Sequence, residues 1–466
     1  MDDAAAEQAV ERLRAMIRIP TVSRMAPEVA DESQFMAFRA LLARLYPLII
    51  EHLGLEIVGG GTLLFRWPGR GTGARSTEGP STEARSTKAP SVLMAHYDVV
   101  PADEPGWTHG AFDAELVDSA DEKRGPEQRI WGRGAIDDKG MMAVILEAVE
   151  ASLAEGVEPA ADIYLSFGHN EETAGDGASD VVALFTQRGI RPALVIDEGG
   201  AVVTGVFPGI DAPIAVVGVT EKGIAGVELS VSKKGGHAST PVRGGATSRL
   251  ARAILKLERS PSRASISAPT MAMIRALGPH ARQPLRFVFT RARMFRGLLT
   301  TAFARLGPET EAMVRTTRAV TRLTGSAGDN VIAERATAMV NVRIAVGSSL
   351  EQAVSDIRKA VDDPEVAVRL VYGSEPAPVS RSDGPVWQLL SEAITDTFPG
   401  SVVAPYVMLQ ASDSRHFAEI SDGVYRFLPF DLTADERGAL HAIDESIRVS
   451  TYLRGIEFFK RLISAL

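Results

Sequence analysis

The stretch SVLMAHYDVVP, residues 91–101, decides the fold class, because an apolar run ends there in two polar side chains. Residues 92–95 are all apolar, as in a strand that is buried on both faces of a parallel sheet. The run delivers His96 and Asp98 at its carboxyl end. Since open α/β sheets bind ligands at the carboxyl ends of their strands, the stretch predicts a parallel sheet with a functional site along that edge.

Two later stretches repeat this pattern. In ADIYLSFGHNEE, residues 161–172, an apolar run is followed by Glu171 and Glu172. In PALVIDEGG, residues 192–200, another apolar run delivers Asp197. We expect these carboxylates to meet the side chains of the first strand at the same edge of the sheet.

Two further candidates come from turns. WGRGAIDDKG, residues 131–140, is a Gly-rich turn that carries Asp137 into a helix with apolar residues at helical spacing. GALHAIDES, residues 438–446, supplies His441. Taken singly, each of these motifs is most often an ordinary strand end, helix cap or turn. In ordered combination they predict one metal site with the ligands His96, Asp137, Glu172, Asp197 and His441.

The five side chains favour two divalent ions. Two ions about 3.5–4 Å apart need a shared ligand, because their like charges repel, and the two oxygens of a carboxylate can supply it. Asp137 is the candidate bridge. The chain has no cysteine, which excludes thiolate ligands. We therefore expect two zinc ions per chain, with manganese or cobalt as alternatives.

Two neighbouring acids are predicted to assist without binding metal. Glu171 precedes the ligand Glu172, and a carboxylate beside the ions suits a general base that takes a proton from the attacking water. Asp98 lies two residues after His96 on the same face of the strand. It can therefore accept the other ring N–H of that histidine and fix its tautomer.

Together the motifs resemble those of the zinc aminoacylase and carboxypeptidase family, metallopeptidase family M20, and are most similar to its carboxypeptidase S-like branch. The resemblance spans nearly the whole chain. In order, the motifs that carry it are HYDVVP (96–101), GRGAIDDKG (132–140), GHNEETAG (168–175), VIDEGG (195–200), KGGHASTP (234–241), DNVIAERATAMVNVRIAVGSS (329–349) and GALHAIDES (438–446).

The resemblance implies a division of the ligands between the two ions. The bridge Asp137 would be shared by two ligand sets, one completed by His96 and Asp197 and the other by Glu172 and His441. The residues assigned above as general base and as histidine partner would keep those roles. A cis peptide bond would follow the bridging aspartate.

Four further residues gain a role through the resemblance. His237 would stabilise the oxyanion of the tetrahedral intermediate, often from the other subunit of a dimer. Asn330 and Arg343 would hold the substrate, the arginine through its planar fork. Ser412, in ASDSRHF, stands where the family usually has threonine in the substrate pocket. The plain alternative for each is a surface or locally paired residue.

Length and pattern predict two domains. A chain of 466 residues exceeds the usual limit for one hydrophobic core. Residues 1–215 and 374–466 alternate strands and helices and should form one mainly parallel α/β catalytic domain. Residues 216–373 are expected to form a smaller α+β lid or dimerisation domain, with a basic helical region over about 284–322. Residues 69–90 are rich in Gly, Ser, Thr and Pro and predict a surface loop.

The composition of the chain limits the classes of partner that we expect it to bind. A formal charge of −9 with mixed signs gives no basic field for nucleic acid. The chain has no 18-residue apolar run for a membrane span and no signal-peptide pattern at its start. The absence of cysteine is compatible with a reducing compartment. We expect a cytoplasmic protein without a nucleic-acid or membrane partner.

The expected reaction is hydrolysis of an amide bond next to a free carboxylate, as in a carboxypeptidase or dipeptidase that acts on short peptides. The alternative is an N-acyl-amino-acid amidohydrolase or synthase. A non-catalytic binding protein of the same fold is the third hypothesis. We expect a homodimer. The alternative is a monomer in which the helical region over residues 284–322 covers the edge of the sheet.

Overall fold

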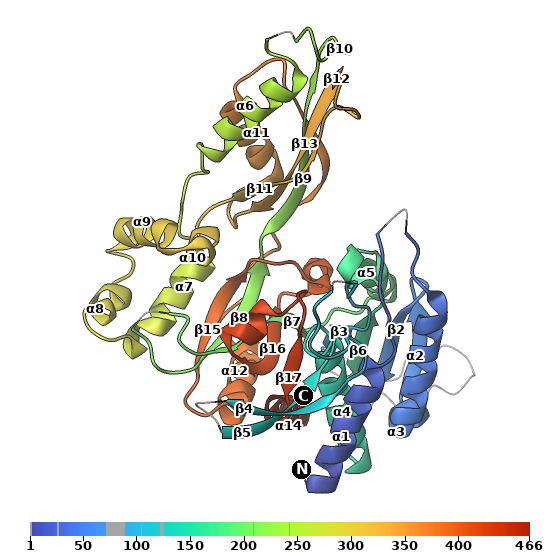
Figure 1. The fold of residues 1–466 in the computed structure, drawn as a ribbon. Helices are drawn as coiled ribbons and strands as arrows, with labels where there is room; N and C mark the ends of the chain where they lie inside the picture. Colours follow the sequence, from blue (N-terminus) through green and yellow to red (C-terminus); the bar gives the residue numbers. More distant parts are fainter. Residues whose placement is uncertain are drawn as a thin grey trace.

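The computed structural model describes residues 2–25, 28–70, 89–103, 105–121, 125–207, 209–241 and 243–466. It forms a large α/β domain and a smaller α+β domain that extends away from it (Figure 1). Most of the surface loop predicted over residues 69–90 lies outside the described residues.

The large domain is built on an eight-stranded sheet with four adjacent parallel strands at its centre. In spatial order the strands are β1 (Gly54–Val58), β2 (Thr62–Trp67), β6 (Ile163–Gly168), β3 (Ser91–His96), β7 (Leu194–Val203), β16 (Val424–Leu432), β8 (Ile214–Glu221) and β15 (Val402–Met408). β3 pairs in parallel with β6 on one side and with β7 on the other. The carboxyl ends of these three strands therefore meet, which confirms the predicted sheet.

Both faces of this sheet are covered, so its central strands are largely buried. Every residue of β3 and β6 is buried. Leu93 packs into the core that contains α1, α4 and α14, whereas Val92 and Met94 pack with α5 on the other face. The helices of this domain are α1 (Asp3–Ile17), α2 (Glu32–Leu45), α3 (Pro47–His52), α4 (Lys139–Ala154), α5 (Gly177–Arg188), α12 (Pro385–Thr397), α13 (Ala434–Gly438) and α14 (Val449–Ala465).

A three-stranded sheet joins two distant parts of the chain. Its order is β17 (Ser446–Arg448), β5 (Gly125–Trp131) and β4 (Leu116–Asp121). β17 and β5 are antiparallel, and Ser446 lies opposite Trp131. The turn that leads from Trp131 to Asp137 is therefore held beside the loop that carries His441.

The small domain is a four-stranded antiparallel sheet that packs against two helices. The strand order is β11 (Thr317–Thr324), β13 (Arg335–Ile344), β9 (Gly223–Ser232) and β14 (Ala367–Ser374), and the helices are α6 (Ala246–Glu258) and α11 (Leu350–Val361). Alternate residues of β9 and β13 pack with these helices in a separate hydrophobic core. At the far tip, β10 (Gly236–His237) pairs with β12 (Val331–Ile332) (Figure 1). The α+β character of the predicted insert agrees with this arrangement.

Four helices from the middle of the predicted insert pack on the large domain instead. They are α7 (Ala268–Leu277), α8 (Leu285–Thr290), α9 (Arg296–Leu306) and α10 (Pro308–Ala312). α7 packs against β15, and buried side chains from Ile266 to Val314 belong to the core of the large domain. The sequence pattern did not reveal this, because both domains contain amphipathic helices.

The predicted boundaries shift in two further places. The helical region expected over residues 284–322 ends at Ala312, because β11 begins at Thr317. The large sheet continues to Glu221 in β8, beyond the boundary expected at residue 215. We propose that the small domain comprises residues 222–265 and 315–375. Within the described ranges, none of the helices combines the length and apolar character that a membrane crossing requires.

Candidate metal centre

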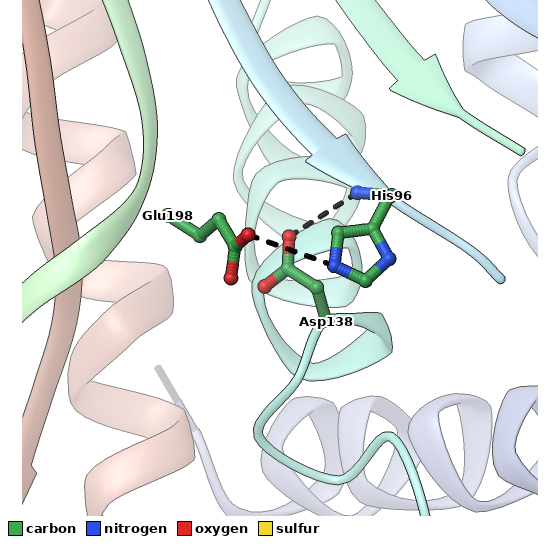
Figure 2. Close-up of side chains that lie close together, drawn as sticks. All are labelled: His96, Asp138 and Glu198. Carbon is green, nitrogen blue, oxygen red and sulfur yellow. Dashed lines mark hydrogen bonds and ion pairs between the residues drawn. The ribbon is translucent and has the colours of Figure 1, made fainter. Parts of the chain in front are cut away.

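His96 is the last residue of β3, and its imidazole lies among carboxylates. Its Nε2 atom is 3.2 Å from Asp137 Oδ1 and 3.8 Å from Glu198 Oε1. Its backbone N–H donates to Asp138 Oδ2 at 3.2 Å. Figure 2 shows the carboxylates of Asp138 and Glu198 pointing toward this histidine. Two groups of ligand atoms that could hold a metal ion both include it: His96 with Asp138 and Glu198, and His96 with Asp137 and Glu172.

Asp98 lies on the other side of the ring. The Nδ1 atom of His96 is 3.0 Å from the Asp98 backbone oxygen and 3.3 Å from its Oδ1. The predicted contact between these residues is therefore present. The Asp98 carboxylate also accepts the backbone N–H groups of Glu171 at 3.2 Å and Glu172 at 3.1 Å. Asp98 thus fixes both the histidine and the start of the short 3-10 helix η1 (Glu171–Thr173).

Asp137 faces two histidines, one with each carboxylate oxygen. Oδ1 faces His96, while Oδ2 is 3.0 Å from Nε2 of His441. The same His441 nitrogen is 3.2 Å from Glu172 Oε2. The peptide bond between Asp137 and Asp138 is cis, as the resemblance implied. The structure therefore brings four of the five predicted ligands together.

Glu445 holds the turn that carries Asp137. This glutamate is fully buried, and its carboxylate accepts the backbone N–H groups of Gly134 at 3.1 Å, Ile136 at 2.8 Å and Asp137 at 3.1 Å. It also pairs with the buried Arg133 at 2.8 Å. Because Glu445 belongs to the same loop as His441, it ties two ligand-bearing segments together. A lone glutamate gives no such signal in the sequence.

The two acids in the middle of β7, Asp197 and Glu198, have different surroundings. Asp197 Oδ2 accepts the backbone N–H of Ser414 at 2.8 Å. In the described part of the chain, Asp197 joins neither ligand group, whereas Glu198 joins one through its contact with His96. Successive side chains of a strand point to opposite sides, so the two acids cannot both face this point. Glu198, which was not among the predicted ligands, lies beside His96, where Asp197 was expected.

The carboxylates of the cluster oppose one another electrostatically. Burial raises the pKa of Glu198 well above its usual value, and the charge of Asp137 adds to this. Burial likewise raises the pKa of Glu171, with Asp413 adding to it. Asp137 and Asp98 differ from these acids, because hydrogen bonds with His96, and for Asp137 also with His441, outweigh burial and lower their pKa values. Cations placed among these groups would relieve the repulsion.

Divalent cations fit the residues present. Buried polar atoms are normally paired, and a buried charge needs a partner. Carboxylate oxygens and imidazole nitrogens together form a donor set that zinc, manganese and cobalt accept. Three carboxylate oxygens around the cluster are nevertheless buried without a hydrogen-bond partner: Glu172 Oε1, Asp138 Oδ1 and Asp413 Oδ1.

Ser412 has a different environment from the one predicted. Its side chain is fully buried, and its hydroxyl donates to Glu221 Oε1 at 2.7 Å and contacts Ser414 Oγ at 2.8 Å. Glu221 is itself paired with the buried Arg426 at 2.6 Å. This network leaves the hydroxyl no access to a substrate, which corrects the expectation that Ser412 contacts it.

His237 and Asn330 lie together at the tip of the small domain. His237 is opposite Val331 in the β10–β12 pair, and the backbone oxygen of Asn330 accepts the N–H of Ala238 at 2.9 Å. Both residues are exposed. Figure 1 places β10 and β12 at the end of the small domain that is farther from the large sheet. Within one chain, these two residues are therefore remote from the carboxylate cluster.

Arg343 lies near the opposite end of the same sheet. It pairs across with Ile224, close to the point where the chain enters the small domain. Burial lowers the pKa of Arg343, so its guanidinium is partly withdrawn from water. At about 3.4 Å per residue, the stretch of β13 from Arg335 to Arg343 spans about 27 Å. Arg343 and His237 of one chain therefore cannot contact the same small substrate.

Comparison with known proteins settles the family. Residues 92–465 match the profile of "Peptidase family M20/M25/M40". The chain belongs to this family. It is 33% identical to "Probable carboxypeptidase S-like 2" of Dictyostelium discoideum, over 93% of this chain and 79% of the relative. It is 32% identical to "N-fatty-acyl-amino acid synthase/hydrolase PM20D1" of Xenopus tropicalis, over 98% of this chain and 85% of the relative.

The fold of this M20 chain matches that of an M20 family metallo-carboxypeptidase, Sso-CP2 from Sulfolobus solfataricus. The TM-score is 0.66 at 17% identity, over 100% of this chain and 99% of that chain. The family and the carboxypeptidase S-like branch are those that the sequence motifs predicted. The protein is therefore an M20 family hydrolase with a two-domain α/β fold.

Proposed function

We propose that the protein hydrolyses amide bonds that lie next to a free carboxylate, with two zinc ions per chain or manganese or cobalt in their place. The main observation behind this proposal is the position of Asp137. Its two carboxylate oxygens face two different histidines, His96 and His441. A carboxylate in this position is suited to bridge two ions. Divalent ions there would polarise a substrate carbonyl and activate a water molecule.

The proposed ligand sets follow from the contacts that Asp137 makes with the two histidines and from the other acids that contact those histidines. Its Oδ1 atom, His96 and Glu198 would hold one ion. Its Oδ2 atom, His441 and Glu172 would hold the other. Glu198 thereby takes the role first assigned to Asp197.

Glu171 is the proposed general base. It lies beside the ligand Glu172 and outside both ligand groups of the described residues, so its carboxylate is free to carry a proton. It takes a proton from the attacking water and delivers it to the nitrogen of the leaving amine. Asp98 positions this base by accepting its backbone N–H, and it orients His96 at the same time.

The small domain is proposed to supply the substrate contacts. Arg343 would bind the free carboxylate of the substrate. His237, which would stabilise the oxyanion, and Asn330 would reach the site from the partner subunit of a homodimer, because the tip is remote from the cluster in its own chain.

The relatives favour two substrate classes. The carboxypeptidase S-like relative favours short peptides, which remain our first choice. The N-fatty-acyl-amino acid synthase/hydrolase favours N-acyl amino acids. In both classes the amide nitrogen belongs to an amino acid with a free carboxylate, the group that Arg343 would bind. A chain without cysteine fits the cytoplasm, which we propose as its location.

Matched acid and amide substrates test this function. The metal-loaded enzyme should hydrolyse dipeptides or N-acyl amino acids and act poorly on the same compounds with an amidated carboxyl group. Arg343→Ala should reduce kcat/KM for the acids by the equivalent of about 2–5 kcal/mol and change it little for the amides. Arg343→Lys should recover part of the loss, because an ammonium cannot form the paired contact.

Two outcomes would contradict the proposal. Equal losses on acids and amides would show that Arg343 supports the fold rather than the substrate. Failure of the metal-loaded enzyme to hydrolyse any member of either substrate class would exclude the proposed reaction itself.

A further inference from the structure

A basic segment stands out in this otherwise acidic chain. Residues 259–308 contain nine arginines and no aspartate or glutamate, although the whole chain has a formal charge of −9. The arginines are Arg259, Arg263, Arg275, Arg282, Arg286, Arg291, Arg293, Arg296 and Arg305. The segment includes α7, α8 and α9, which lie on the side of the large domain opposite α2 (Figure 1). None of these residues belongs to the proposed active site.

The outer side of α8 and α9 also exposes large apolar side chains. α9 packs on the large domain through Leu299 and Phe303, while Leu298 on its other side is 59% exposed and Leu306 at its end is 66% exposed. Met294, just before α9, is 67% exposed. Such a cluster is not explained by the folding of this chain.

Arginine and aromatic side chains of α8 and of the start of α9 are in contact. The Arg291 guanidinium lies 4.3 Å from the centre of the Phe287 ring, and that ring is 5.8 Å from the Phe295 ring at the start of α9. Arg286 and Arg293 are also exposed, and in the described part of the chain neither makes an ion pair. We call this the α8–α9 surface; it comprises Arg286, Phe287, Arg291, Arg293, Met294, Leu298, Arg305 and Leu306.

We propose that the α8–α9 surface docks the protein onto an anionic lipid bilayer. Arginines would bind the phosphate groups of the lipids, and the apolar side chains would enter the boundary between headgroups and acyl chains. A nucleic acid would engage the arginines but leave Met294 and Leu298 in water. A second copy of the chain would bring two positive surfaces together, which their charge opposes. The expectation of no membrane partner rested on spanning segments, which surface docking does not require.

Vesicle sedimentation of the metal-loaded, full-length chain tests this proposal independently of the hydrolase activity. The protein should sediment with vesicles that contain phosphatidylglycerol and not with phosphatidylcholine alone, and salt should weaken the binding. Arg293→Glu with Met294→Ser should reduce binding at least about fivefold, since each basic residue near the membrane surface contributes about that factor.

The matched control is Arg44→Glu with Met36→Ser, where both side chains are exposed. These residues belong to α2, which lies on another side of the molecule (Figure 1). It should bind vesicles as the parent does. Both double variants should keep the parent activity without vesicles. No sedimentation with anionic vesicles, or an equal loss in both variants, would overturn the proposal. Binding to a DNA duplex or to polyglutamate in place of vesicles would also overturn it.

Discussion

In the middle of β7, Asp197 and Glu198 place the same chemical group in different surroundings. Asp197 accepts the backbone N–H of Ser414, whereas Glu198 reaches His96. We expect Glu198→Gln to weaken the binding of one of two ions at least about tenfold, because an uncharged amide is a poorer ligand for a divalent cation. Asp197→Asn should retain both ions, since asparagine can still accept the Ser414 N–H.

The measurement is metal content by elemental analysis, together with competition against a chelator, on both folded variants. Loss of one ion from Asp197→Asn, with both retained by Glu198→Gln, would restore Asp197 as the ligand.

Substitutions of Glu171 and of its neighbour Glu172 should also differ in their effects on metal content and turnover. Glu171→Gln keeps the size of the side chain but removes the base, so turnover should fall at least about a hundredfold while two ions stay bound. Glu172→Gln should lose metal as well as activity. Steady-state kinetics and metal content of the two variants check this expectation, and metal loss from Glu171→Gln would make Glu171 a ligand instead.

At the scale of elements, the site depends on two loops that meet through one buried carboxylate. Glu445 accepts three backbone N–H groups of the turn before α4, in addition to its ion pair with Arg133. This turn carries Asp137, and the loop of Glu445 carries His441. The relative position of the two ligands therefore depends on Glu445, although that residue touches neither the proposed ions nor the substrate.

Glu445→Gln should both destabilise the protein and loosen the site. Breaking a buried ion pair costs about 3–5 kcal/mol, and disturbing groups that orient ligands costs about 10–100-fold in metal affinity. Urea unfolding and chelator competition measure the two effects.

Glu436→Gln is the matched control, because Glu436 is buried and paired with Arg129 and Arg448 but does not contact the Asp137 turn. It should lower stability while the folded protein keeps its metal affinity. If both variants changed the metal affinity equally, Glu445 would have no specific role in positioning the ligands.

At the scale of the whole molecule, one chain does not bring all the proposed site residues together. The carboxylate cluster lies at the carboxyl ends of central strands of the large sheet. His237 and Asn330 lie at the tip of the small domain. The α7–α10 helices pack on the large domain and belong to its core, so the small-domain sheet keeps β11 and β14 as its outer strands. Such edges are available for pairing with a second copy.

If His237 acts across a dimer, mixing two inactive proteins should restore activity. In a hybrid of His237→Ala and Glu171→Gln subunits, one of the two sites has both residues intact. At full exchange of equal amounts, about a quarter of the parent sites should be active. Activity after subunit exchange, followed by size-exclusion chromatography, is the measurement.

Mixing His237→Ala with Asn330→Ala provides the control, because every hybrid site then keeps one defect. Demonstrated exchange without recovery in the first mixture would show that His237 does not act in trans. A fully active monomer would exclude the arrangement as well.

The sequence determined the family, the parallel sheet and most of the candidate site. His96 and Glu172 follow runs that are buried on both faces, and Asp137 lies in a Gly-rich turn, so local pattern alone gave their positions. Such signals survive in sequence because strand ends and turns are encoded by residues close together in the chain.

Tertiary structure decided what depends on direction and on distant partners. Glu198 rather than Asp197 contacts His96 because of the side of β7 that faces the histidine, and Ser412 is buried in contact with Glu221. The placement of α7–α10 on the large domain likewise depends on which core their apolar faces reach. Sequence pattern shows that a side chain is apolar or charged, but packing against segments far away in the chain decides what it touches.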